Sequence, residues 1–152
     1  MNNTKLTQEG FKILETELND LISVKRPKAV ERLKKARGMG DLSENSEYSA
    51  AREEIELIEN RIQEIEYVIK NAEIAQDNHN NHEISLGSNV TTESEGKREK
   101  FYMVGEFEAD PLKNKLSVTS PIGKALLGKK IGNIIEVDVP AGKKVYKILE
   151  IN

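Results

Sequence analysis

The chain has 152 residues, no cysteine and a formal net charge of −3 at pH 7. The absence of cysteine excludes a disulfide framework and a thiolate metal site, and the mildly negative charge argues against a protein that coats nucleic acid. No apolar run approaches the roughly 20 residues that span a bilayer, so we expect a cytoplasmic protein with no membrane partner.

Composition divides the chain. Residues 1–75 are rich in Glu, Lys, Leu, Ile and Ala, whereas residues 83–152 hold three of the four prolines and seven of the ten glycines. We therefore expect an α+β protein, with a helical part over 1–75, a polar linker over 76–82 and a β-rich domain over 83–152.

The first predicted element is a long helix that starts after Thr7, whose hydroxyl can cap it, and ends at Gly38. Its apolar positions recur every three or four residues and are Phe11, Leu14, Leu18, Leu21, Val30, Leu33 and Ala36. One slip in this pattern falls at Arg26-Pro27. Because proline lacks a backbone N–H, we expect a kink or a change of register there.

A second helix is predicted from its unbroken seam of apolar residues. The seam consists of Tyr48, Ala51, Ile55, Ile58, Ile62, Ile65, Ile69 and Ala72. Such 4/3 spacing is typical of a coiled coil, and the short connection makes the two helices antiparallel neighbours. The hairpin then extends roughly 50 Å from its turn, at 1.5 Å per residue. That length is more than a small core requires.

Charge is unevenly distributed along this hairpin. Basic residues crowd the end of the outgoing helix, and acidic residues crowd the start of the returning one. One interpretation is ion pairing between the helices at positions that flank the seam. The other is a basic stripe that contacts RNA or DNA phosphates, for which Arg37 and Arg52 are the best candidates because they flank the turn on both helices.

The turn between the helices carries two carboxylates, Asp41 and Glu44. Their spacing is that of a capping box, with Asp41 as the N-cap of the second helix and Glu44 reaching back to it. Alternatively, two carboxylates in one exposed turn can share Mg²⁺ with the carboxylates and phosphates of a partner. Such a half-site suits two-metal phosphoryl chemistry. Spacing alone leaves both readings open.

The second half of the chain predicts an antiparallel sheet with one short helix. Predicted strands cover residues 83–92, 100–107, 115–119, 131–139 and 144–151, with turns at 94–97 and 140–142. A helix over 121–127 is expected to start at Ser120 as N-cap, with Pro121 in its first turn.

Five stretches of the chain together resemble one known family. They are Leu6–Gly10, Arg26-Pro27, Gly40–Tyr48, Ala50–Glu54 and Ser120–Lys130. In order and spacing they are similar to the bacterial transcript cleavage (Gre) factors over nearly the whole chain. The resemblance implies an N-terminal coiled coil, followed by an FKBP-like domain that docks on RNA polymerase through the surface of Ser120, Pro121 and Ile122.

The resemblance also implies an activity. The coiled coil would enter the secondary channel of RNA polymerase, where Asp41 and Glu44 help hold an Mg²⁺ ion jointly with the enzyme. The polymerase would then cleave the 3′ end of backtracked RNA, so the factor, acting as a monomer, is not itself an enzyme and has no cofactor of its own. Alternatives are a channel-binding inhibitor that promotes no cleavage, and a coiled-coil chaperone or adaptor. A prolyl isomerase is disfavoured, because the β-rich half has few aromatic residues to line a pocket.

Overall fold

The computed structural model describes residues 4–41, 45–75 and 82–152. It divides into two compact units: residues 11–71, called here the hairpin unit, and residues 1–10 with 72–152, called the β unit. The boundaries predicted from composition stay a prediction, and positions 76–81 of the predicted linker lie outside the described residues. No helix in the described ranges is long and apolar enough to cross a membrane.

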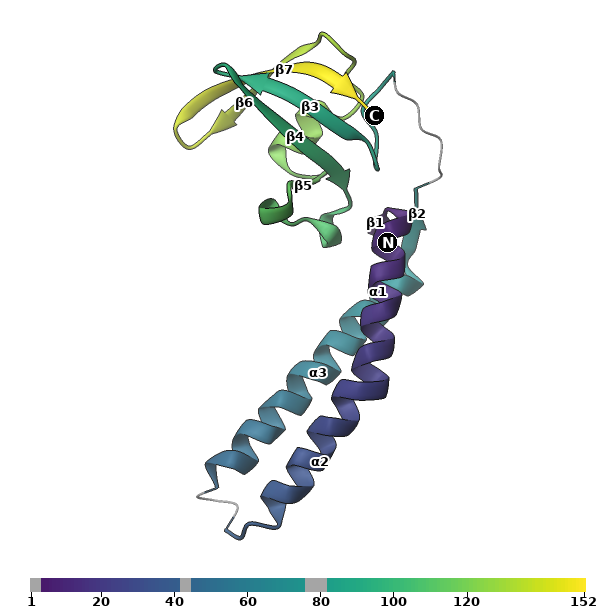
Figure 1. The fold of residues 1–152 in the computed structure, drawn as a ribbon, viewed down its shortest axis with the longest axis vertical. Coiled ribbons are helices and arrows are strands. Elements are labelled where there is room, and N and C mark those ends of the chain that lie inside the picture. Colours follow the sequence, from purple (N-terminus) through teal and green to yellow (C-terminus); the bar gives the residue numbers. More distant parts are fainter. Residues whose placement is uncertain (1–3, 42–44, 76–81) are drawn as a thin grey trace. The chain divides into compact units, whose positions relative to one another are not determined.

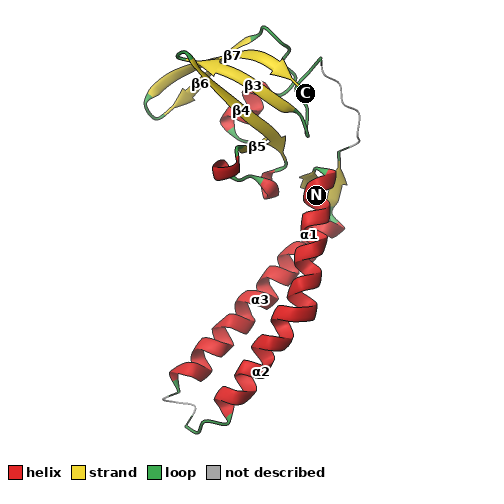
Figure 2. Ribbon diagram, viewed as in Figure 1, coloured by secondary structure: helices red, strands yellow, loops and turns green. Residues whose placement is uncertain are grey.

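The helices form the expected hairpin, in which two long arms run side by side (Figures 1 and 2). The outgoing arm is continuous but is built of three segments, and the returning arm is a single helix. Their bounds are α1 Gln8–Asp20, a π-helix at Leu21–Lys25, α2 Arg26–Arg37 and α3 Ser46–Lys70. Thr7 caps α1 as predicted, since its hydroxyl oxygen accepts a hydrogen bond of 3.0 Å from the Gly10 N–H.

The π-helix lies where the apolar pattern slips. The Arg26 N–H donates to the Leu21 carbonyl, five residues earlier, and the next residue, Pro27, has no N–H to donate. Leu14 and Leu21 are buried seven residues apart, as are Ala29 and Ala36. Between Leu21, the first residue of the π-helix, and Ala29 the spacing is eight. The prediction of Val30 as a seam residue is therefore wrong: Val30 is 37% exposed, and Ala29 is buried in its place.

The returning helix buries one face against the outgoing arm. Its buried residues are Ala51, Ile58, Ile62, Ile65 and Val68. Four of these belong to the predicted seam, so its periodicity is confirmed as far as Ile65. At the end of the helix the prediction is wrong: Val68 is buried in place of Ile69, and Ala72 lies beyond Lys70, where α3 ends. The seam changes character along its length, from alanines near the turn to isoleucines farther along.

The β unit contains a five-stranded sheet in the order β5-β4-β3-β7-β6. The strands are β3 Asn89–Ser94, β4 Lys97–Val104, β5 Lys115–Ser117, β6 Ile134–Val139 and β7 Gly142–Ile151. Neighbouring strands are antiparallel except β4 and β5, which are parallel. The expectation of a wholly antiparallel sheet is wrong in this detail, because the chain between β4 and β5 forms two short 3₁₀ turns, Glu106–Glu108 and Pro111–Lys113, and not a hairpin.

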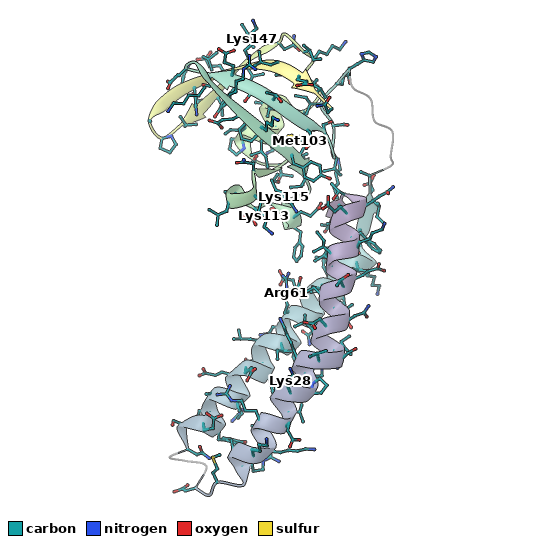
Figure 3. The ribbon with its side chains drawn as sticks, in the orientation of Figure 1. Lys28, Arg61, Met103, Lys113, Lys115 and Lys147 are labelled. Atoms are coloured by element: carbon teal, nitrogen blue, oxygen red, sulfur yellow. The ribbon has the colours of Figure 1, made fainter. Side chains whose placement is uncertain are left out.

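A short helix, α4 (Pro121–Leu126), packs on one face of this sheet (Figure 1). The Ser120 hydroxyl accepts a hydrogen bond of 3.0 Å from the Gly123 N–H, so the predicted N-cap is confirmed. Leu126 is fully buried in one apolar cluster with residues of the sheet such as Met103 (labelled in Figure 3) and Ile148.

The chain also forms a two-stranded parallel pair that the sequence did not predict, β1 (Thr4–Leu6) with β2 (Ala72–Ile74). Beside it, the Glu108 carboxylate accepts three hydrogen bonds. The Thr7 N–H donates at 2.9 Å, the Thr7 hydroxyl at 2.5 Å and the Gly105 N–H at 3.1 Å. Glu108 thus fixes the first turn of 3₁₀ helix and the end of β1 to each other.

Candidate functional site

The turn of the hairpin is the first part of the candidate site. α2 ends at Arg37, and Gly40 adopts a φ of 115°, a conformation that favours glycine. Asp41 follows and is exposed. Glu44, the second predicted carboxylate, lies outside the described residues.

Asn45 is the residue that caps the returning helix. Its backbone is extended, and its Oδ1 accepts a hydrogen bond of 3.1 Å from the Tyr48 N–H. The reading in which Asp41 is the N-cap of this helix is therefore wrong, because α3 starts at Ser46 and not near residue 42. The preference of N-cap positions for asparagine could have identified Asn45, had the helix start been known.

Arg32 joins the two helices beside the turn. Its Nε lies 2.6 Å from Glu47 Oε1, and its Nη1 lies 2.7 Å from Glu54 Oε2. Hydrogen bonds from Arg32 hold the pKa of the Glu47 carboxyl below its ordinary value, and the same two carboxylates raise the pKa of Arg32. One guanidinium on α2 therefore binds two carboxylates of α3 that are seven residues, or about two turns, apart.

Ion pairs continue along the hairpin away from the turn. Arg26 Nε lies 2.8 Å from Glu59 Oε1, and Arg61 Nε, on the side chain labelled in Figure 3, lies 2.7 Å from Glu17 Oε1. A hydrogen bond from Arg61 lowers the pKa of Glu17. The predicted ion pairing between helices is thus confirmed for Arg26 and Arg32, whereas the pair of Arg61 with Glu17, in which the returning helix supplies the cation, was not predicted.

Arg37 and Arg52, the predicted nucleic-acid contacts, are both exposed and form no ion pair with another described residue. The Arg52 guanidinium lies 6.0 Å from the centroid of the Tyr48 ring, a geometry that allows a cation–π contact. Their role in binding RNA stays a prediction, but both remain available to an anionic ligand.

A groove of about 360 Å³ opens between α2 and the start of α3. Its lining residues are Lys28, Glu31, Arg32, Lys35, Ala36, Met39 and Glu47. Lys28 (labelled in Figure 3) and Lys35 form no ion pair within the described ranges, so they add two cations to this groove. Sequence reasoning counted both in the basic stretch but did not place them at a groove.

The predicted docking residues lie in the β unit, at the start of α4. The Ser120 hydroxyl also donates to the Ser117 carbonyl at 2.6 Å, Pro121 is exposed, and Ile122 packs half-buried against the core. Ser120 and Ile122 thus have structural roles, and Pro121 presents the most open surface of the three. Their contact with a polymerase stays a prediction.

The fold and the turn together define a class: a chain with an antiparallel helical hairpin whose turn offers an exposed carboxylate, joined to a small sheet domain. Residues 4–74 match the family described as transcription elongation factor, N-terminal. Residues 79–152 match the family described as transcription elongation factor, GreA/GreB, C-terminal. The chain belongs to the GreA/GreB family of transcription elongation factors.

Relatives of known name are similar to this chain along nearly its whole length. The chain is 48% identical over 149 residues to transcription elongation factor GreA of Thermoanaerobacter pseudethanolicus, covering 96% of this chain and 95% of the relative. It is 50% identical over 149 residues to GreA of Caldanaerobacter subterraneus subsp. tengcongensis, with the same coverage. Among solved structures, GreA factor homolog 1 (Gfh1) of Thermus thermophilus is 31% identical, with a TM-score of 0.47 and 99% of both chains covered.

Proposed function

We propose that this factor stimulates RNA polymerase to cleave the 3′ end of backtracked RNA and thereby rescues arrested complexes. In this proposal, the hairpin enters the secondary channel of the polymerase, and the turn reaches the catalytic centre. One observation carries the proposal: Asn45 caps α3, while Asp41 is exposed in the turn that precedes it. The capping role that competed with a metal role for Asp41 thus belongs to another residue.

The chemistry of the turn fits a shared magnesium site. Mg²⁺ is commonly held by one or two carboxylates together with substrate phosphates and water. Asp41 and Glu44 would supply the carboxylates from this chain, and the polymerase would supply the rest. When bound, the ion would lower the pKa of a water molecule and stabilise charge on the phosphate. The catalytic centre then belongs to the polymerase, and this chain is not an enzyme.

Other parts of the chain would hold the complex together. Arg37 and Arg52 would bind phosphates of the backtracked RNA, aided by the cations of the groove beside them. The start of α4, with Ser120, Pro121 and Ile122, would dock on the rim of the channel. We place the factor in the cytoplasm and expect it to act as a monomer.

Cleavage by purified polymerase in backtracked complexes tests the proposal. Asp41→Asn and Glu44→Gln should each abolish stimulation, because an amide is a poor magnesium ligand, while binding of the factor to polymerase is retained. Glu53→Gln, at an exposed position of α3, is the matched control and should stimulate like the wild type. If both turn variants retain full stimulation, the carboxylates have no metal role.

The same assay distinguishes the alternatives. A channel-binding inhibitor would slow RNA synthesis and produce no cleavage, and a chaperone or adaptor would act without polymerase or Mg²⁺. No observation on the hairpin or the β unit favours either alternative.

A further inference from the structure

Asn45 bonds to both arms of the hairpin through one side chain. Its Nδ2 donates a hydrogen bond of 2.7 Å to the Ala36 carbonyl in the last turn of α2. Its Oδ1 accepts a hydrogen bond of 3.1 Å from the Tyr48 N–H in the first turn of α3. A single carboxamide thus joins the end of one helix to the start of the next, across the segment that carries the acidic pair.

The Ala36 carbonyl is a fixed anchor for this bond. The Ala36 side chain is fully buried, and so is that of Ala51 on α3, the helix that packs against α2. The same carbonyl also accepts a hydrogen bond from the Met39 N–H. The Ala36 carbonyl is thus held by the packing of its residue and by a backbone hydrogen bond. Its position can therefore fix that of the Asn45 side chain bonded to it.

The two bonds of Asn45 require different chemical groups. The bond to the Tyr48 N–H needs an acceptor, which Asp or Ser would also provide at an N-cap. The bond to the Ala36 carbonyl needs a donor on the second branch of the side chain. An ionised aspartate has no donor, and serine has no second branch. Asparagine is therefore more specific here than helix capping alone demands.

We propose that Asn45 is a positioning residue for the acidic turn. The bond to Ala36 holds the start of α3 against the end of α2, and so fixes the two chain ends between which Asp41 and Glu44 are carried. This inference rests on the proposed function, since it assigns to Asn45 the alignment of the carboxylates that act there. Small displacements of a reacting group are sufficient to slow catalysis strongly.

Asn45→Asp separates positioning from capping. The aspartate keeps the acceptor for Tyr48 and suits the positive end of the helix dipole, so α3 should form normally. Its carboxylate cannot donate to the Ala36 carbonyl, so the bond across the turn is lost. Asn45→Ser loses the same bond without adding charge, and Asn60→Asp, at an exposed position of α3, adds the same charge elsewhere.

We expect Asn45→Asp and Asn45→Ser to lower the cleavage rate at saturating factor by on the order of 10-fold or more. The factor concentration that gives half-maximal cleavage should stay the same, as should the helical circular dichroism and the hydrogen-exchange rate of the Tyr48 amide. Asn60→Asp should behave like the wild type.

Two results would overturn the inference. One is wild-type cleavage by both Asn45 variants, which would leave Asn45 as a helix cap only. The other is a loss of activity that follows a loss of helix or of Tyr48 protection in both variants. If the wild-type factor stimulates no cleavage, both the proposed function and this inference fail. If the wild type stimulates cleavage and the Asn45 variants stimulate it equally well, only this inference fails.

Discussion

The hairpin unit and the β unit are stabilised by different kinds of contact. The β unit encloses a continuous apolar cluster in which Met103, Leu126 and Ile148 are fully buried. The hairpin buries only one row of residues on each arm, and near the turn that row consists of alanines such as Ala36 and Ala51. Alanine contributes little apolar area, so the end of the hairpin depends more on polar contacts.

Those polar contacts are at the place where the proposed chemistry occurs. Arg32 binds two carboxylates of α3, and Asn45 joins the helix ends. Apolar burial therefore stabilises the β unit, which we propose docks on the polymerase. Hydrogen bonds and ion pairs shape the end of the hairpin, which we propose takes part in cleavage. Stability and activity should therefore respond to different substitutions.

The largest effect on stability should come from the sheet. Ile148→Ala removes a fully buried side chain of β7 and should lower the free energy of unfolding of the β unit by about 2–5 kcal/mol. Urea unfolding followed by tyrosine fluorescence measures this, since Tyr146 is buried in the same cluster. Ile134→Ala, at a position on β6 that is 66% exposed, is the control. Equal losses in the two variants would contradict the comparison.

The β unit also depends on one polar contact, the hydrogen bonds accepted by Glu108. Glu108→Gln replaces a carboxylate that accepts three hydrogen bonds by an amide with one acceptor oxygen, so the Thr7 hydroxyl loses its charged acceptor. We expect a loss of about 1–3 kcal/mol in the free energy of unfolding. Glu106→Gln, an exposed residue of the same 3₁₀ turn, should cost almost nothing. A neutral Glu108→Gln would mean that burial alone stabilises this unit.

Acid should weaken the hairpin through the ion pair of Glu17 with Arg61. The pKa of Glu17 is held below its ordinary value of 4.5, chiefly by the hydrogen bond from Arg61. Because the pKa is lower in the folded state, this stabilisation is present above the unfolded value and is lost as pH falls through the folded one. We expect a loss of up to about 1 kcal/mol. Helical circular dichroism during thermal unfolding measures it, and Glu17→Gln should reduce the pH dependence.

The smallest effect on stability should follow the change with the strongest effect on activity. Asp41→Asn alters an exposed residue that is not the N-cap of α3, so the free energy of unfolding should stay within about 0.5 kcal/mol of the wild type. Urea titration measures this alongside the cleavage assay. A loss of more than 1 kcal/mol would show that Asp41 has a structural role. It would then contradict the view that stability and activity depend on different residues.

Much of this architecture follows from local patterns in the sequence. The heptad seam of α3 and the caps at Thr7 and Ser120 depend on neighbours a few residues away, so they were predictable. Val30 was wrongly assigned to the seam. Periodicity showed where the spacing of apolar residues changes in the outgoing arm, but not that the change is one extra residue.

Features set by distant partners were harder to predict. The parallel pairing of β5 with β4 depends on the path of the chain between them, and strands β1 and β2 have three residues each, too few for a pattern. Asn45 was missed because the capping-box spacing of Asp41 and Glu44 offered an equally good helix start nearby. Its second bond, to Ala36, requires the fold of the whole hairpin.

The π-helix at Leu21–Lys25 makes the length of the outgoing arm adjustable by one residue. Its wider turn accommodates one residue more than the regular spacing of seven, and buried positions on both sides still face α3. Deletion of the exposed Ser23 should therefore restore the spacing of seven between Leu21 and Ala29 and leave Ala29 and Ala36 in the seam, while Pro27 still interrupts the backbone hydrogen bonds of the arm. Hairpins that differ by one residue here can thus present the same turn, so sequence length alone is a poor guide to how far such a hairpin reaches.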